Sequence, residues 1–184
     1  MENGAFFLKR AIDSVTCQEY KDYEIVLVKE GLMAKNTNAG IKRARGDIIK
    51  ILYMDDYLAS PFSLGEIAYH FKFGWMVTGC LHDNGAVGNP HEPVWSDEIA
   101  KGINTIGSPS VLCFENSGPL LFDENLSFQL DCDLYTRLYQ RYGKPAILNA
   151  MNVVIGLHPG QTTHLLSDKQ KEDEFLYINK KYAK

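Results

Sequence analysis

Helical and extended hydrophobic patterns alternate over the first eighty residues of the chain. An apolar stripe at helical spacing over 7–15 predicts an opening amphipathic helix. Apolar runs over 24–28 and 48–53 predict two buried strands, and the segment 36–45 between them suits a helix that ends at Gly46. This alternation predicts an α/β sandwich with a mainly parallel sheet.

The second half of the chain is less regular but still mixes helices with strands. A stretch rich in Gly, Asn, Pro and His over 82–93 predicts an exposed loop. The sequence contains no internal repeat and no low-complexity segment. The other predicted elements are a helix over 62–73, a strand over 75–81, short strands over 111–114 and 120–122, a helix over 131–142, a strand over 146–156 and a charged tail helix over 167–184.

Length and charge limit the class of protein. A chain of 184 residues is long enough for one domain with a substantial core and short for two, so we expect a single domain over 1–184. The net charge of -4 argues against a protein that coats nucleic acid, and we expect no nucleic-acid partner.

The cysteines and the apolar stretches favour a cytoplasmic protein. The four cysteines are scattered, with no CxxC and no histidine at zinc spacing, which is typical of reduced and mostly buried thiols. Nothing at the N-terminus resembles a secretory signal. The longest apolar stretch, 146–157, is too short to span a bilayer and contains Asn149 and Asn152.

Asp55 and Asp56 are the most prominent candidates for chemistry. They follow a predicted buried strand directly, and ligands of open α/β sheets bind at the carboxyl ends of the strands. Two adjacent carboxylates repel unless a cation or hydrogen-bond donors neutralise them. Mg²⁺ and Mn²⁺ are often held by one or two carboxylates together with substrate phosphates. The alternative is an Asp pair that caps the following turn or helix.

Asp131 and His158 are the other candidates. Asp131, with Asp133 two residues later, opens a predicted helix whose dipole would keep a carboxylate ionised, although a plain N-cap is the more common reason for an isolated Asp. His158 lies where an apolar strand gives way to a turn, a place from which it could bind a metal or a phosphate. A structural histidine is the alternative there.

Six stretches of the chain match, in order, the motifs of one known family. They are 7–15 (FLKRAIDSV), 20–28 (YKDYEIVLV), 36–49 (NTNAGIKRARGDII), 53–58 (YMDDYL), 121–135 (LFDENL and then DCDLY) and 158–161 (HPGQ). They resemble the first helix, the second strand, the N-x-G-I-x-x-A-x-G-(D/E) stretch, the DXD motif, the F-D-E-x-L … E-D-x-D-L-W region and a C-terminal signature of family-2 glycosyltransferases of GT-A fold. No single stretch is decisive, but the ordered set is specific.

The resemblance implies a three-layer GT-A sandwich that uses a nucleotide-diphospho-sugar as donor. It implies that Asp55 and Asp56 bind the ribose and the metal-diphosphate of the donor. It implies further that Asp56 and His158 hold Mn²⁺ or Mg²⁺. Asp131 is then the base for the acceptor hydroxyl.

The resemblance also divides the chain. Residues 1–81 become the nucleotide-sugar-binding half, 82–166 the acceptor and catalytic half, and 167–184 a C-terminal tail helix. Asn38 and Gly40 fall among the donor-binding residues of the first half, although the pattern alone allows them simply to mark a turn inside the helical segment.

Three departures from the family pattern stand out. The family begins with a strand such as V-S-I-I-P-T-Y-N, which this sequence lacks, and Val28 is followed by Lys-Glu-Gly instead of an Asp-Asp-Gly-Ser loop. Tyr53 takes the first DXD position, and Leu130 takes the place of a Glu. Two interpretations of the first two departures stay open: residues absent before Met1 and after Val28, or a natural variant with impaired donor binding.

The predicted function is a metal-dependent, inverting transfer of a sugar to an acceptor hydroxyl. The acceptor is a saccharide, a lipid-linked sugar or a protein, with association at a membrane surface and the oligomeric state left open. A sugar-nucleotide pyrophosphorylase would need a Gly-rich basic phosphate loop after the first strand, and none is visible. A non-catalytic or degenerate nucleotide-sugar-binding domain of the same fold is the alternative.

Overall fold

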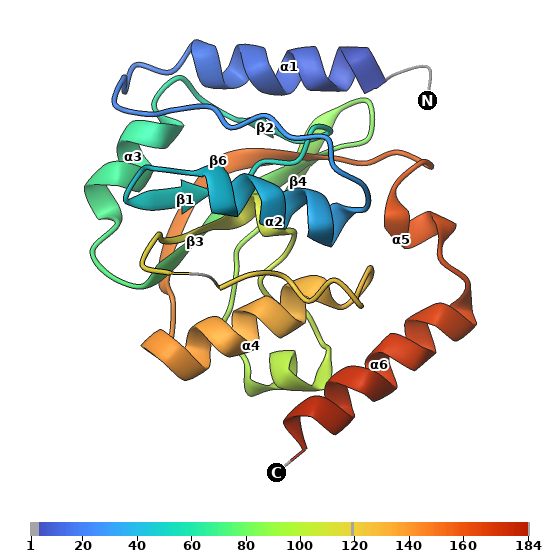
Figure 1. The fold of residues 1–184 in the computed structure, drawn as a ribbon. Helices are drawn as coiled ribbons and strands as arrows, with labels where there is room; N and C mark the ends of the chain where they lie inside the picture. Colours follow the sequence, from blue (N-terminus) through green and yellow to red (C-terminus); the bar gives the residue numbers. More distant parts are fainter. Residues whose placement is uncertain (1–3, 119, 184) are drawn as a thin grey trace.

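A six-stranded sheet forms the centre of the computed structural model, which describes residues 4–118 and 120–183 (Figure 1). The helices are α1 Gly4–Thr16, α2 Met33–Arg43, α3 Ser63–His70, α4 Leu130–Tyr142, α5 Thr162–Leu165 and α6 Asp168–Tyr182, with 3₁₀ helices at Asp97–Lys101 and Pro109–Val111. The strands are β1 Ile48–Lys50, β2 Tyr57–Leu58, β3 Trp75–Asp83, β4 Val87–His91, β5 Leu112–Glu115 and β6 Ala146–Gly156.

The sheet is mixed, where the sequence predicts a mainly parallel one. Its order is β1-β5-β3-β6-β2, with β4 paired to β3 beside this path. Among the strands of the described residues, β3 and β6 pair in parallel, and the other four pairs are antiparallel. The reason is the connections: β3 turns back at once into β4, whereas a parallel partner needs a long crossover, which α4 provides before β6.

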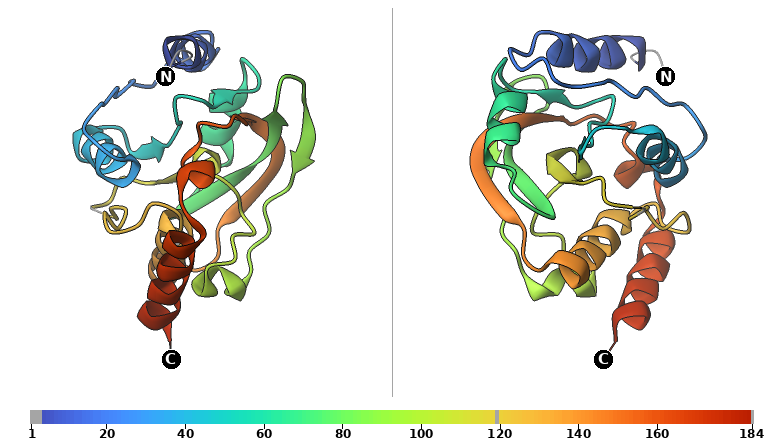
Figure 2. Two further views of the ribbon diagram at one scale, coloured as in Figure 1. Left: turned by 90° about the vertical axis from the view of Figure 1, so that its right-hand side faces the viewer. Right: turned by 60° about the vertical axis from the view of Figure 1, so that its left-hand side comes forward.

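Helices cover the sheet from two ends. The three views in Figures 1 and 2 place α1 across one end of the curled sheet and α4 and α6 beyond the other. The core between these layers contains Trp75 and Val77 of β3 with Leu134, Tyr135 and Leu138 of α4, all at most 1% exposed. The ring of Trp75 stacks on that of Tyr135, so the central strand and the helix after it share one aromatic contact.

Most helices predicted from periodicity are confirmed, because amphipathic spacing is a local property. The predicted helices over 7–15, 36–45, 62–73 and 131–142 correspond to α1, α2, α3 and α4. The predicted tail helix corresponds to α6, which begins with a capping box between Ser167 and Gln170; residue 184 lies outside the described residues.

Three predictions about strands and loops were wrong. The segment 24–28 forms no strand in the described structure, and its Ile25 and Leu27 side chains are 47% and 61% exposed. An apolar run becomes a buried strand only where another edge pairs with it. The segment 120–122 is also no strand, and part of the predicted loop 82–93 is the strand β4.

The cysteines are all free thiols, and the described helices include none suited to a membrane. All four cysteines are free; Cys80, Cys113 and Cys132 are buried, as predicted, whereas Cys17 is exposed. Over residues 4–118 and 120–183, no helix has both the length and the apolar character needed to cross a bilayer.

Asn38 fastens α2 to the segment before α4. Its side chain is buried, its Oδ1 accepts the N–H of Phe122 at 2.7 Å, and its Nδ2 donates to the carbonyl of Phe122 at 2.9 Å. The same Nδ2 donates to Glu124. The side chain therefore substitutes for the strand partner that the segment 120–122 lacks.

We expect Asn38→Ala to lower the free energy of unfolding by about 1–3 kcal/mol per buried backbone group left without a partner. The control is Asn84→Ala in the exposed turn between β3 and β4, which should leave stability nearly unchanged. Urea unfolding of both variants measures the difference. Equal stability of the two variants would show that Asn38 does not fasten α2.

Candidate active site

The two adjacent carboxylates of the turn between β1 and β2 face different surroundings. Asp56 is 2% exposed, and its Oδ1 accepts the backbone N–H of Gly156 at 2.9 Å. Asp55 has a side chain 20% exposed, and its Oδ2 lies 3.3 Å from Nε2 of His158. The carboxylate that reaches His158 is therefore that of Asp55, and not that of Asp56, which the sequence pattern places at the metal.

Burial controls the ionisation of Asp56. Desolvation, followed by the negative charge of Asp55, raises the pKa of the Asp56 carboxyl from 3.8 to about 7. Hydrogen bonds from Ser110 and Gly156 and the charge of Lys50 oppose this rise. Lys50 itself donates to the carbonyls of Ser110 and Ile51. Asp56 thus joins the turn to the end of β6 from inside the molecule.

Side chains of α1 hold the exposed half of this site. Arg10 donates to the carbonyl oxygen of Asp55 at 2.8 Å and to the carboxylate of Asp83 at 2.7 Å. Its guanidinium lies 4.1 Å from the ring centroid of Tyr57. One turn earlier, the ring of Phe7 stacks on His158 with centroids 4.9 Å apart. Sequence reasoning missed these residues; the one available signal is a cationic Arg10 within the apolar stripe of the first helix.

The hydrogen bonds of His158 assign its tautomer. The backbone N–H of Gly160 donates to Nδ1 at 3.1 Å, so Nδ1 is the acceptor of the ring. A neutral imidazole then carries its proton on Nε2 and donates from there towards Asp55. In this arrangement His158 is suited to donate to an oxygen, whereas binding a metal through Nε2 would require the Gly160 contact to break.

Asp131 lies in the first turn of α4. The N-cap of that helix is Gln129, so the simple capping interpretation of Asp131 is wrong. Oδ1 of Asp131 accepts the N–H of Cys132 at 2.7 Å, and Oδ2 accepts Nδ2 of Asn104 at 2.6 Å. Burial raises the pKa of its carboxyl from 3.8 to about 6, close to the range in which a general base works best.

Asp133, two residues later, is a structural residue. Its side chain is fully buried and accepts hydrogen bonds from Arg137, Lys181 and Tyr182. This separates the two acidic residues that the sequence places together at the start of the helix.

Asp131 and the acid pair influence the same buried tyrosine. Burial raises the pKa of the Tyr53 phenol, and the charges of Asp131, Asp56 and Asp55 raise it further. The segment 104–110 links them as well, because Asn104 binds Asp131 and Ser110 stabilises Asp56. Asn38 and Gly40 do not join this group: Asn38 binds the backbone of Phe122, and Gly40 packs near Val28.

A metal ion would find few protein ligands at this site. Within residues 4–118 and 120–183, no three His, Cys, Asp or Glu side chains are grouped so that they could hold a metal ion. Asp55 is the partly exposed carboxylate at the turn, and Mg²⁺ or Mn²⁺ commonly uses one or two carboxylates with substrate phosphates and waters. The residues present fit such a substrate-assisted ion, and do not fit an all-protein cage.

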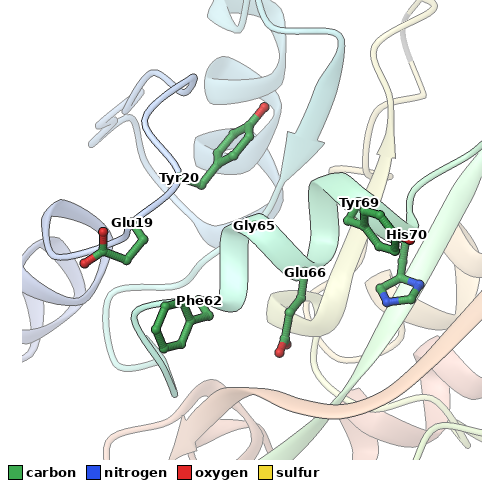
Figure 3. A pocket seen from close by; sticks show the side chains of 7 residues that line it. All are labelled: Glu19, Tyr20, Phe62, Gly65, Glu66, Tyr69 and His70. Carbon is green, nitrogen blue, oxygen red and sulfur yellow. The ribbon is translucent and has the colours of Figure 1, made fainter.

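Two hollows elsewhere on the surface do not include these residues. Figure 3 shows one of about 290 Å³, at the small end for a ligand pocket, between α3 and the segment after α1. Its lining residues are Glu19, Tyr20, Phe62, Gly65, Glu66, Tyr69 and His70. Two carboxylates without a lysine or arginine make it unsuitable for a diphosphate. The second hollow, about 390 Å³, lies along α2 and is lined by Glu30, Lys35, Ala39, Lys42, Arg43 and Glu124.

The fold matches that of S. aureus TarS structures, which confirms the α/β class predicted from the sequence. The structure is similar to that of S. aureus TarS 1–349 in complex with UDP-GlcNAc, with a TM-score of 0.72, 15% sequence identity, and coverage of 96% of this chain and 62% of that one. It is similar to TarS 1–349 in complex with UDP, with a TM-score of 0.67, 15% identity, and coverage of 98% and 70%.

These likenesses concern the fold alone. A structure of TarS that is not limited to 1–349 is matched with a TM-score of 0.64 at 15% identity, over 96% of this chain and 42% of that one. The chain therefore spans less than two thirds of the first matched structure and less than half of the longer one. No protein-family model and no curated protein matches the sequence.

We expect Asp56→Asn to change how stability depends on pH. Folding raises the pKa of this carboxyl from 3.8 to about 7. The free energy of unfolding of the wild type should therefore fall as the pH rises from about 4 to 7, because the carboxyl ionises in the unfolded chain before it ionises in the folded protein. Asn keeps an oxygen for the N–H of Gly156 but has no charge to bury. The Asn variant should therefore gain stability relative to wild type as the pH is raised through this window.

Thermal unfolding of both proteins at pH 4.5 and 7.5, in the presence of a chelator, measures the effect. Asp22→Asn, at an exposed position, is the control and should follow wild type at both values. A constant difference between Asp56→Asn and wild type across the window would contradict the burial of this charge.

Proposed function

We propose that the protein is an inverting glycosyltransferase that moves a sugar from a nucleotide-diphospho-sugar to an acceptor hydroxyl. The observation that carries the proposal is the contact between Asp55 and His158 at the turn between β1 and β2, to which we add Asp131 of α4 as a second carboxylate. Asp55 is partly exposed beside His158, Asp131 has a raised pKa, and the charges of both raise the pKa of the Tyr53 phenol. The likeness of the fold to TarS structures with UDP-GlcNAc and UDP supports the same donor class.

The donor diphosphate binds at the turn between β1 and β2. Asp55 would hold Mn²⁺ or Mg²⁺ together with phosphate oxygens, and the ion supplies positive charge that stabilises the leaving nucleoside diphosphate. His158 donates from Nε2 to a diphosphate oxygen, a role that fits its tautomer. Arg10 keeps the backbone of Asp55 in place through its carbonyl. Asp56 contributes to the site indirectly, because the hydrogen bond that it accepts from Gly156 fixes the turn to β6.

Asp131 acts as the general base. The acceptor oxygen attacks the anomeric carbon, and its proton passes to the carboxylate of Asp131. The bond between that carbon and the diphosphate oxygen breaks, and its electron pair leaves with the nucleoside diphosphate. Attack from the face opposite the leaving group inverts the anomeric configuration. A carboxyl with a pKa of about 6 is ionised at neutral pH and basic enough to accept the proton.

The division of labour along the chain follows from these roles. Residues 1–81 bind the donor, 82–166 supply the base and the acceptor surface, and the tail from 167 supports the base-bearing helix. Membership of family 2, a cytoplasmic site of action and a saccharide, lipid-linked or protein acceptor belong to the same proposal.

A second candidate is a domain that binds a nucleotide-sugar without transferring the sugar. One observation favours it: both carboxylate oxygens of Asp131 already accept hydrogen bonds, from Cys132 and Asn104. A base in use must exchange one of these bonds for the acceptor hydroxyl.

We expect Asp131→Asn to lower the rate of sugar transfer by about 10²–10⁴-fold, the usual contribution of a positioned base. Thermal stability at pH 7.5 should change little: the amide removes a charge that burial disfavours, but its NH₂ group no longer accepts one of the two hydrogen bonds from Cys132 and Asn104. The donor KM should stay near that of wild type, since the diphosphate binds at Asp55. Release of nucleoside diphosphate from a panel of nucleotide-sugars, with Mn²⁺ and an acceptor mixture, measures both parameters.

Normal turnover by the Asn variant would overturn the role of Asp131. Donor binding by wild type without any transfer or hydrolysis would instead support the second candidate. Absence of donor binding in wild type would overturn both.

A further inference from the structure

The helix that carries Asp131 begins without a capping side chain of its own. Gln129 occupies the N-cap and makes no side-chain cap. The backbone N–H groups at such a helix start have no partner within the helix and need one elsewhere. In α4 the segment that leads into the helix finds its partner in α6, far along the chain.

Glu174 of α6 accepts three consecutive backbone N–H groups before α4. The distances are 2.9 Å from Ser127, 2.7 Å from Phe128 and 2.8 Å from Gln129. One carboxylate thus fills a concave group of N–H donors immediately ahead of Leu130, in the way that an anion fills a backbone nest. Hydrogen bonds to an ionised acceptor are about twice as strong as neutral ones, so this contact fixes the turn firmly.

A second group of contacts from α6 involves Asp133, on the C-terminal side of Asp131. Lys181 contacts the carboxylates of Asp123 at 2.8 Å and Asp133 at 2.7 Å, and Tyr182 donates to Asp133 at 2.6 Å. The residues before and after Asp131 are therefore both held by α6.

We propose that Glu174 is a positioning residue for Asp131, acting through the backbone of the turn that begins α4. This inference rests on the proposed function, in which Asp131 accepts the proton of the acceptor. With the turn fixed, Oδ1 of Asp131 stays on the N–H of Cys132, and Oδ2 stays on Asn104. Without it, the first turn of α4 frays, and the carboxylate leaves its half-buried place.

The attachment of α6 does not depend on Glu174 alone. Ile178 is fully buried in the core, Lys181 forms its two ion pairs, and the helix starts with its own capping box at Ser167. Loss of the Glu174 carboxylate therefore frees the turn before α4 while α6 remains docked. Ser167→Ala does the reverse: it weakens α6 at its start and leaves the turn untouched.

The test compares Glu174→Gln with Ser167→Ala and with Glu172→Gln at an exposed position of the same helix. Glu174→Gln should lower kcat by about tenfold or more and leave the donor KM unchanged, because only the base is displaced. Both controls should keep kcat within about twofold, since they change neither charge nor contact near Asp131.

A second readout does not depend on activity. Carboxyl ¹³C resonances of labelled Asp report the pKa of Asp131, which should fall from about 6 towards 3.8 in Glu174→Gln as its burial is lost. Tyr53, Cys132 and Tyr135 beside it have raised pKa values and stay neutral over this range. Asp133 is held in ion pairs with Arg137 and Lys181, and Asp56, whose pKa is about 7, is followed as a separate resonance. The controls should keep the wild-type value.

Unchanged kcat and unchanged Asp131 pKa in folded Glu174→Gln would overturn the proposal. Equal losses in Ser167→Ala would overturn it too, because α6 would then act only through stability. If Glu174→Gln does not fold, Glu174→Asp, which keeps the charge but is too short for all three N–H groups, takes the same two readouts with the same criteria. Absence of transfer in wild type would refute the proposed function, while the pKa comparison would still decide the role of Glu174.

Discussion

The buried carboxylate of Asp56 accepts the N–H of Gly156 and so joins the turn after β1 to the end of β6. The two segments come so close that a Cβ on residue 156 would lie 2.3 Å from the carbonyl oxygen of Asp55, which only glycine avoids. That same carbonyl oxygen accepts from Arg10 of α1. The position of Asp55, the orientation of α1 and the end of the parallel pair β3–β6 all follow from this closure.

The contact between Asp56 and Gly156 also explains how two adjacent acidic residues can have different roles. Adjacent side chains in a turn point in different directions, so Asp56 turns inward and Asp55 turns outward to His158. With a pKa of about 7, the Asp56 carboxyl is partly protonated at neutral pH, which lowers the electrostatic repulsion between Asp55 and Asp56. Asp55 can then remain the charged partner for a substrate-bound cation. Burial is also the main cause of the raised pKa of Asp131.

Periodicity allowed the helices and the central strand to be predicted, because both depend on local spacing of apolar residues. The ordered motifs also included Asp55 and His158, whose side chains meet at 3.3 Å, and Asp131, whose role stays a prediction. Strand pairing could not be predicted from the sequence, because it depends on which strand edges meet in the folded protein. The segment 24–28 is apolar enough for a strand yet pairs with none, and β4 forms from a sequence typical of a loop. Side-chain direction was beyond reach for the same reason, as the buried roles of Asn38 and Asp56 illustrate.

A crystal structure with UDP and Mn²⁺, analysed for anomalous scattering, tests the central claim most directly. If Asp55 holds the cation of the donor, one manganese peak lies about 2 Å from a carboxylate oxygen of Asp55 and from diphosphate oxygens. The account also predicts that His158 Nε2 lies within hydrogen-bond distance of the diphosphate, and that Asp56 stays on Gly156. A manganese peak away from Asp55, or UDP bound in the hollow between α3 and the segment after α1, would contradict it.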